Sequence, residues 1–425
     1  MTKTASAPAG RLTAAQGTAL YVGAVLGTGV VALPAVAAAI AGPASLLAWL
    51  ALAVISAPIA GAFAALGARY PDAGGVATYA RLAFGEPAAA VVGWCFYFTV
   101  PVGAPAAALW AGGYAAGAIG GGRVTVTVTA LILLIGVPAT NWFGVHLTSK
   151  VQLALGGLLV AFLLAAVALS LPKADLANLH PFAPHGWPAI GSAAAILVWS
   201  FAGWETVTYL TAEFRRPSRD VPRATAAAVI VVGILYLLVA SATIIVLGPA
   251  AAEGEAPLGD LLAAGVGGNG RVLAAVPAVL LTFGAMNAYH AGAAKLLAAL
   301  GRDGAAPAWF SRGSLAGEVP RRSLVLVAVL NVLVFTFVSV RGIGTRPLVF
   351  MTTGLFVAVY VIGVGAAVRL LPRRTPAYAA ALIGLVAVIA LLLMSGRYLI
   401  WPVLVTAAAL LYRRLRQREP PIGNS

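Results

Sequence analysis

The chain has 425 residues, of which 61% are hydrophobic and only 9% are charged. Soluble domains carry charge on about a quarter of their residues, so this composition excludes a soluble globular protein and predicts an all-α integral membrane protein. The formal net charge of +15 could suit nucleic acid, but the basic residues lie mainly between apolar segments, where they set orientation in a membrane. We therefore expect a lipid bilayer, and no nucleic acid, as a partner.

Twelve apolar segments have about the length that crosses a bilayer. If they alternate from a cytoplasmic N-terminus, the outer side receives few of the 27 lysines and arginines. This asymmetry predicts that both termini are cytoplasmic and that the protein lies in the inner (plasma) membrane. The predicted spans are 14–40, 45–68, 88–119, 124–141, 148–171, 189–212, 222–248, 271–299, 323–340, 346–369, 377–395 and 397–412. The basic residues left outside are Arg123, Lys173, Arg271, Arg341, Arg346 and Arg397.

The first predicted span is interrupted at Gly27-Thr28-Gly29. Each glycine costs roughly 1 kcal/mol relative to alanine inside a helix, and an unpaired backbone group is costly in lipid. We interpret the interruption as a break in helix 1 near the middle of the membrane, whose freed backbone groups bind a ligand.

Three features precede the sixth span. Residues 76–84 predict a short amphipathic helix at the membrane interface, and Pro101 and Pro105 predict a kink in the third span. In the outer loop, His180 and His185 are interpreted as solvated residues, because no cysteine or carboxylate pair accompanies them. No metal site is therefore expected there.

The sixth predicted span repeats the anomaly of the first. Gly203 and Glu205 lie near its middle, and Glu205 is the only carboxylate within the twelve spans. An ionisable residue at this depth is functional by default. Two interpretations stay open: Glu205 responds to protons, or it is a protonated side chain hydrogen-bonded between helices.

The eighth predicted span carries Asn287 and His290, which are three residues apart and therefore share a helix face. Both are candidates for coupling or gating, and the alternative for His290 is a hydrogen bond between helices. Lys295, closer to the cytoplasm, is expected to extend its ammonium toward the interface.

Helices 1 and 6 are five helices apart and run in opposite directions, which is typical of an inverted repeat. We predict that helices 1–5 and 6–10 form the two repeats, with broken helices 1 and 6 and a site between them at the midplane. The predicted divisions are a cytoplasmic tail at 1–12, one transmembrane domain at 13–414 with repeats at about 13–171 and 189–369 and extra helices at about 377–414, and a second cytoplasmic tail at 415–425.

Short motifs follow one another in a recognisable order from about Leu12 to the last helix. They are Leu26-Gly27-Thr28-Gly29-Val30 with Pro34, Tyr70-Pro71, Ala73-Gly74-Gly75-Val76-Ala77, Ala83-Phe84-Gly85, Pro101-Val102-Gly103 with Pro105-Ala106-Ala107, Phe201 with Gly203 and Glu205, Glu213-Phe214 with Pro217, Arg219-Asp220, Pro222-Arg223-Ala224, and Asn287 with Tyr289. In this order the chain resembles the amino acid, polyamine and organocation (APC) superfamily of secondary transporters, and within it the branch that exports L-methionine and branched-chain amino acids.

The resemblance implies a LeuT-like, five-plus-five inverted-repeat fold and transport by alternating access. It also implies that a substrate's carboxylate meets the N–H groups of 27–29 while its ammonium meets carbonyls near Phe201 and Ala202. This polarity agrees with the partial charges at helix ends. The side chain would face the apolar residues Val25, Val102, Phe201 and Trp204. The whole implied substrate-binding set is Val25, Gly27, Thr28, Gly29, Val102, Ser200, Phe201, Ala202, Gly203 and Trp204.

The expected function is therefore export of neutral aliphatic amino acids, namely methionine, leucine, isoleucine and valine, with no cofactor. The alternative within the superfamily is an importer or exchanger of other amino acids or amines. An enzyme is disfavoured because no set of nucleophile, base and orienting group is found. Proton-coupled relatives often carry a lysine in helix 5, where this chain has Leu158 and Leu159, so Glu205 is the candidate for a proton as the coupling ion.

Overall fold

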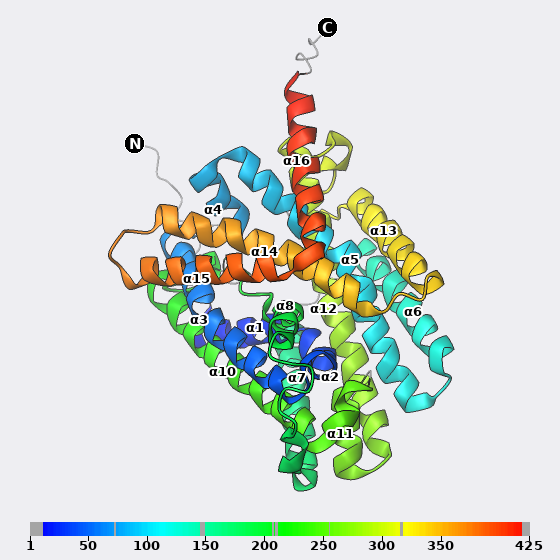
Figure 1. Ribbon diagram of the computed structural model, residues 1–425. Helices are drawn as coiled ribbons and strands as arrows, with labels where there is room; N and C mark the ends of the chain where they lie inside the picture. Colours follow the sequence, from blue (N-terminus) through cyan, green and yellow to red (C-terminus); the bar gives the residue numbers. More distant parts are fainter. Residues whose placement is uncertain are drawn as a thin grey trace.

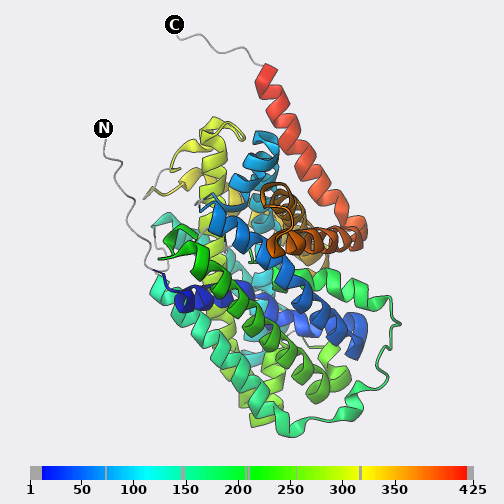
Figure 2. The same ribbon diagram turned by 90° about the vertical axis from the view of Figure 1, so that its left-hand side faces the viewer.

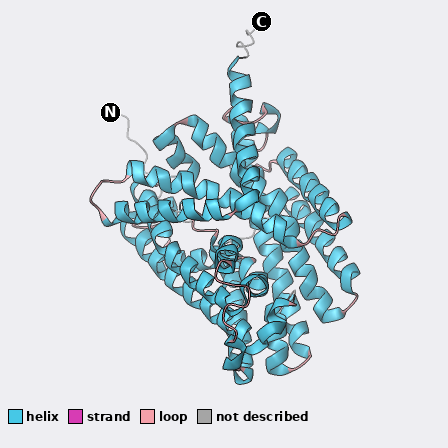
Figure 3. Cartoon of the chain, in the orientation of Figure 1, coloured by secondary structure: helices cyan, strands magenta, loops and turns pink. Residues whose placement is uncertain are grey.

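The computed structural model describes residues 12–71, 74–144, 149–205, 208, 211–254, 256–314 and 318–418. These residues form a bundle of helices, as Figures 1 and 3 show. No named strand occurs in the described ranges, and an isolated bridge pairs Leu12 with Phe214.

The helices fall into three groups by length. The long α-helices are α3 (Ser45–Arg69), α5 (Glu86–Ile119), α6 (Gly122–Trp142), α7 (Ser149–Ser170), α10 (Pro217–Leu247), α12 (Asn269–Arg302), α13 (Arg321–Val340), α14 (Thr345–Leu370), α15 (Pro376–Met394) and α16 (Ile400–Arg418). The short α-helices are α1 (Ala14–Leu26), α2 (Gly29–Ala41), α4 (Gly75–Phe84), α8 (Ala189–Phe201) and α11 (Pro257–Val266). The 3-10 turns are η1 (Gly42–Ala44), η2 (Leu171–Lys173), η3 (Leu176–Leu179), η4 (Thr211–Glu213), η5 (Gly248–Ala252), η6 (Ala308–Ser311) and η7 (Gly396–Leu399).

Ten segments of the described chain are long and apolar enough to cross a membrane, where the sequence predicts twelve. The difference has a local cause, because two of the predicted spans are interrupted. The first splits into α1 and α2, and α2 continues through η1 into α3. The helix of the sixth span stops at Phe201, after only 13 residues.

Two other expectations concern α4 and α5. The short helix predicted over 76–84 is confirmed as α4, which begins one residue earlier. The kink predicted at Pro101 and Pro105 stays a prediction, and α5 is one helix that runs through both prolines to Ile119.

Helix α5 lies at the centre of the bundle and contacts α4, α6, α12, α13, α14 and α16. Its buried face is rich in Gly, Ala and Pro, and small residues let helix backbones approach closely in a membrane. Side chains of α5 reach both broken helices, since Tyr114 donates to the Val31 carbonyl of α2 and Trp110 packs on Trp199 of α8. Helix α8 packs on α2, α3 and α14. Figure 2 shows that α16 projects beyond the rest of the bundle. The interruptions are therefore enclosed by long helices on several sides.

Candidate functional site

The break in the first helix is set by its glycines. Helix α1 ends at Leu26 because Gly27 takes φ 35° and ψ −146°, a backbone conformation that residues with a side chain rarely adopt. Helix α2 begins directly afterwards, at Gly29. The last carbonyls of α1 and the first N–H groups of α2 therefore lack partners within their own helices.

The break after α8 has a similar origin. Helix α8 ends at Phe201, Ala202 is extended, and Gly203 has φ +125°. The N–H of Gly203 donates to Oε2 of Glu205 at 2.9 Å and to the hydroxyl of Tyr360 at 3.0 Å. Side chains therefore take over the backbone bonding that the helix gives up here.

The two breaks lie against each other. A methyl group on Gly29 would lie 2.7 Å from Oγ of Ser200 and 2.9 Å from its Cα. A methyl group on Gly203 would lie 3.1 Å from both the carbonyl oxygen of Ala24 and the Cα of Val25. Each break thus presents a glycine to the backbone of the other, and this contact brings the N-terminus of α2 beside the C-terminus of α8.

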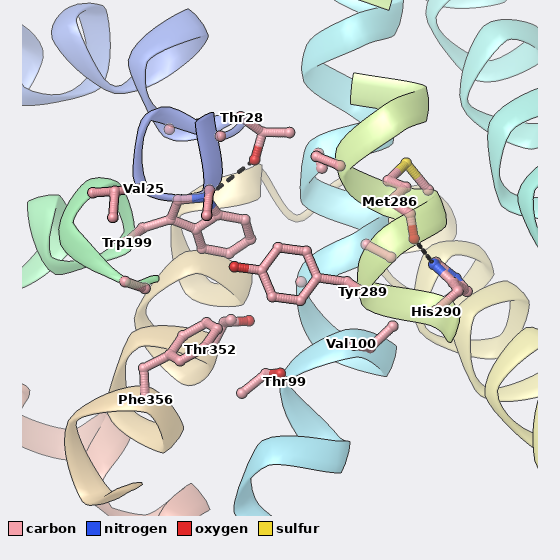
Figure 4. A pocket seen from close by; sticks show the side chains of 18 residues that line it. Val25, Thr28, Thr99, Val100, Trp199, Met286, Tyr289, His290, Thr352 and Phe356 are labelled. Atoms are coloured by element: carbon pink, nitrogen blue, oxygen red, sulfur yellow. Dashed lines mark hydrogen bonds between the residues drawn. The ribbon is translucent and has the colours of Figure 1, made fainter. Parts of the chain in front are cut away.

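A cavity of about 60 Å³ lies beside the breaks. Figure 4 shows its walls, with the ring of Tyr289 reaching across from α12 toward Trp199. Trp199 is held by its own bond, since its Nε1 donates to Oγ1 of Thr28 at 3.2 Å. The lining residues are Ala24, Val25, Gly27, Thr28, Gly29, Thr99, Val100, Gly103, Ala104, Ala107, Trp199, Ala202, Ala285, Met286, Tyr289, His290, Thr352 and Phe356.

The ends of the half-helices give this cavity two opposite charges. The N-terminal end of α2 carries partial positive charge from its free N–H groups, and the C-terminal end of α8 carries partial negative charge. Gly27, Thr28 and Gly29 line the cavity from the first side, and Ala202 lines it from the second. The arrangement suits a small molecule that carries both an anionic and a cationic group.

Only part of the substrate-binding set expected from the sequence reaches the cavity. Val25, Gly27, Thr28, Gly29, Ala202 and the gating candidate His290 line it, whereas Val102, Ser200, Phe201, Gly203, Trp204, Glu205 and Asn287 do not.

Phe201 and Trp204 occupy different surroundings from those expected. They line a separate cavity of about 20 Å³ that they share with Tyr360. The ring of Phe201 packs 4.9 Å from that of Tyr236 and 6.1 Å from that of Trp49. The last turn of α8 therefore directs Phe201 away from the main cavity, and the expectation that both side chains would face a substrate there does not match the geometry.

Glu205 ties the second break to α14. Its side chain is fully buried, and Oε2 accepts hydrogen bonds from the Gly203 N–H and from the hydroxyl of Tyr360. Oε1 has no hydrogen-bond partner among the described residues. The carboxyl group thus links the second break to α14 through hydrogen bonds.

Asn287 and His290 join α12 to its neighbours on the opposite wall. Oδ1 of Asn287 accepts from Nδ2 of Asn141 at 2.7 Å and from Oγ1 of Thr140 at 3.1 Å, both on α6. Nδ1 of His290 is 2.7 Å from the Met286 carbonyl, which can only accept. Nδ1 therefore carries the hydrogen, and Nε2 accepts from Nδ2 of Asn331 on α13 at 2.6 Å. The ring is hydrogen-bonded between helices.

Sequence reasoning missed several cavity residues on α5, α12 and α14. Thr99, Met286, Thr352 and Phe356 lie in spans without glycine pairs or charges at those positions. Tyr289 belongs to a motif with Asn287, but the motif alone does not predict that its ring lines the cavity. Oγ1 of Thr352 is buried and has no hydrogen-bond partner in the part of the chain that the structure describes.

The fold and the site together define a class: a multi-pass helical membrane protein with two facing helix breaks around a small-molecule cavity. Comparison with known families gives the particular family. The chain belongs to the amino acid permease family, whose family model matches residues 12–422.

Three relatives agree with this assignment. An uncharacterized amino acid permease of Bacillus subtilis, YecA, is 33% identical over 405 residues, which cover 94% of this chain and 95% of the relative. The Escherichia coli L-methionine/branched-chain amino acid exporter YjeH is 30% identical over 409 residues, which cover 91% of this chain and 95% of the exporter. The vacuolar cationic amino acid transporter 4 of Arabidopsis thaliana is 27% identical over 365 residues, which cover 79% of this chain and 59% of that transporter. The family and these relatives are membrane transporters of amino acids.

Proposed function

We propose that the protein is a secondary transporter that exports neutral aliphatic amino acids, namely methionine, leucine, isoleucine and valine, by alternating access. The observation that carries the proposal is the pairing of opposite helix ends at one cavity. A zwitterionic amino acid offers a carboxylate and an ammonium about one backbone apart, which complements these two ends.

The backbone of the first break holds the carboxylate in this proposal, through the N–H groups of Gly27, Thr28 and Gly29. The ammonium lies at the carbonyl end of α8, near Ser200, Phe201 and Ala202. Residues 27–29 and Ala202 line the cavity, which supports the arrangement. The carbonyls of Ser200 and Phe201 contribute through the backbone, so their side chains need not face the ligand.

The other walls favour an uncharged side chain. Val100, Met286 and Phe356 provide apolar surface, and the described residues that line the cavity include neither Asp nor Glu. A cationic side chain would therefore lose its hydration without gaining a counter-charge, which is costly. An aliphatic or thioether group has no such cost and gains from burial.

The proposal includes the inverted repeats, the number of membrane spans and the side of the membrane on which the tails lie. Residues 13–171 and 189–369 form the two inverted repeats, which with the helices of 377–414 give twelve spans in the plasma membrane. The tails at 1–12 and 415–425 are cytoplasmic. The occurrence of a break in α1/α2 and another after α8 supports the repeat, because each lies in the first helix of its half.

Glu205 is the proton-sensitive group in this proposal. It is a fully buried carboxyl group beside the second break, and its Oε1 has no hydrogen-bond partner among the described residues. Its protonation would act on the Gly203 N–H and on Tyr360, and so on the position of the break relative to α14. Asn287 and His290 act as gating residues through their bonds to α6 and α13.

Counterflow into liposomes tests the function. Vesicles containing the reconstituted chain are loaded with one unlabelled amino acid, and uptake of labelled methionine, leucine, arginine or lysine is followed. We expect exchange of methionine and leucine and little exchange of the two cationic amino acids. Exchange restricted to arginine and lysine would refute the aliphatic assignment and would favour a cationic transporter of the same family. Right-side-out cell vesicles then compare efflux with uptake, which tests export against the importer alternative.

A further inference from the structure

Tyr236 on α10 meets the carbonyl ends of both broken helices at once. Its hydroxyl lies 2.9 Å from the carbonyl oxygen of Val25 and 3.5 Å from that of Leu26, and it donates to the carbonyl oxygen of Ser200. Val25 and Leu26 are the last residues of α1, and Ser200 lies in the last turn of α8. Tyr236 is fully buried and is not among the residues that line the main cavity.

Acceptors outnumber donors at the Tyr236 hydroxyl, because a phenol has one hydrogen and three carbonyl oxygens lie around it. These carbonyls belong to helix ends that lack partners within their own helices, and both ends carry partial negative charge. Two such ends repel each other unless a donor lies between them. The Tyr236 hydroxyl is that donor, but it can satisfy only part of the acceptor capacity.

Aromatic packing fixes the position of this hydroxyl. The Tyr236 ring lies 5.0 Å from the ring of Trp49 and 4.9 Å from the ring of Phe201. Trp49 and Phe201 are themselves buried, so the phenol has little freedom to swing away. This packing also gives a reason for Phe201 to turn away from the main cavity: its ring supports Tyr236.

We propose that Tyr236 is a positioning residue for substrate binding, which holds the C-terminal ends of α1 and α8 at the separation where their carbonyls receive the substrate's ammonium. The inference rests on the proposed function, since it takes the ligand to be an amino acid. The ammonium adds N–H donors where the phenol supplies only one. Substrate binding therefore completes the bonding between the two helix ends and favours the state in which they are closed together.

The test replaces Tyr236 by Phe in the full-length chain, which removes the hydroxyl and keeps the ring. Tyr97→Phe is the matched control, because Tyr97 is also buried but its hydroxyl has no hydrogen-bond partner among the described residues. Leucine counterflow is measured in proteoliposomes over a range of concentrations. We expect Tyr236→Phe to raise KM about three- to tenfold, as for the loss of one hydrogen bond, with Vmax within about twofold. Tyr97→Phe should change neither value by more than about twofold.

A rescue variant separates the donor from the shape of the ring. Tyr236→4-aminophenylalanine restores N–H donors at the same place, so KM should return to the wild-type value or below it. This variant also tests the inference if Tyr236→Phe does not give a monodisperse protein. A KM that stays raised with the amino group present would overturn the inference.

The remaining outcomes are equally decisive. A wild-type KM in Tyr236→Phe, an equal change in Tyr97→Phe, or a loss confined to Vmax would each overturn the role of Tyr236 while leaving the transport function standing. Wild-type proteoliposomes that exchange no amino acid would instead refute the proposed function, and this inference with it.

Discussion

Gly29 and Ser200 are in direct backbone contact, although they lie in the two different broken helices. A methyl group on Gly29 would be 2.7 Å from Oγ of Ser200 and 3.0 Å from Cδ1 of Trp199. The contact places the first N–H groups of α2 beside the last carbonyls of α8. The charge pattern of the cavity therefore depends on the absence of a side chain at position 29.

Gly29→Ala should reduce leucine counterflow by at least about tenfold. The added methyl group must push α2 away from α8, because real Cβ atoms do not approach backbone atoms at 2.9 Å, and a small displacement of binding groups is costly. The control is Gly61→Ala in α3, where a methyl group meets nothing within 4 Å. Equal transport by the two variants, at equal amounts of folded protein, would argue against a backbone site at this contact.

Glu205→Gln should flatten the pH dependence of transport. Glutamine keeps an oxygen that can accept from Gly203 and Tyr360, and it places an amide nitrogen where Oε1 has no hydrogen-bond partner among the described residues. The variant therefore keeps the geometry and removes the titration. Initial rates of counterflow across a pH series are the measurement, and a profile unchanged from wild type would count against a protonatable role.

Glu205→Leu separates that role from the structural one. Leucine accepts no hydrogen bonds, so the Gly203 N–H and the Tyr360 hydroxyl lose their shared acceptor within the membrane. We expect transport to fall at every pH and the free energy of unfolding to drop by about 1–3 kcal/mol, read as a lower midpoint in thermal unfolding in detergent. A stable and active Glu205→Leu protein would contradict this bracing role.

Gly103→Ala should narrow the range of substrates by size. A methyl group on Gly103 would lie 3.0 Å from Cη2 of Trp199 and 3.2 Å from Cγ2 of Thr352, and all three residues line the cavity. The space for a side chain shrinks, so leucine and methionine should lose more transport than alanine does. Competition by each of the three amino acids against labelled leucine measures the effect. An unchanged order of competition would show that substrate side chains lie elsewhere.

Asn287→Ala should lower stability, because Asn287 accepts two hydrogen bonds from α6. The Thr140 hydroxyl and the Asn141 amide would keep their bonds to the Val137 carbonyl. We expect a loss of about 1 kcal/mol for the missing acceptor, seen as a lower thermal midpoint. Thr140→Val removes only the weaker of the two bonds, at 3.1 Å against 2.7 Å, and should cost less. A larger loss for Thr140→Val would mean that packing, and not this pair of bonds, decides the stability.

The membrane class, the positions of both helix breaks and the carboxyl group at Glu205 could be predicted from the sequence. These are local signals: an apolar run has the length of a bilayer, glycine weakens a helix wherever it lies, and a charge in lipid is costly. Gly27, Gly29 and Gly203 could therefore be identified without knowing what surrounds them.

Which side chains face the cavity and which lie behind its walls depends on how the helices pack, and the sequence alone does not predict it. Phe201 and Trp204 lie outside the main cavity, whereas Thr99, Tyr289 and Thr352 line it. The hydroxyl of Tyr236 lies at the ends of α1 and α8. The physical reason is that these spans are apolar on nearly every face, so no stripe of polarity marks the side that turns inward. That side is chosen by packing between helices far apart in the chain, as when Tyr236 reaches Val25 across 211 residues of sequence.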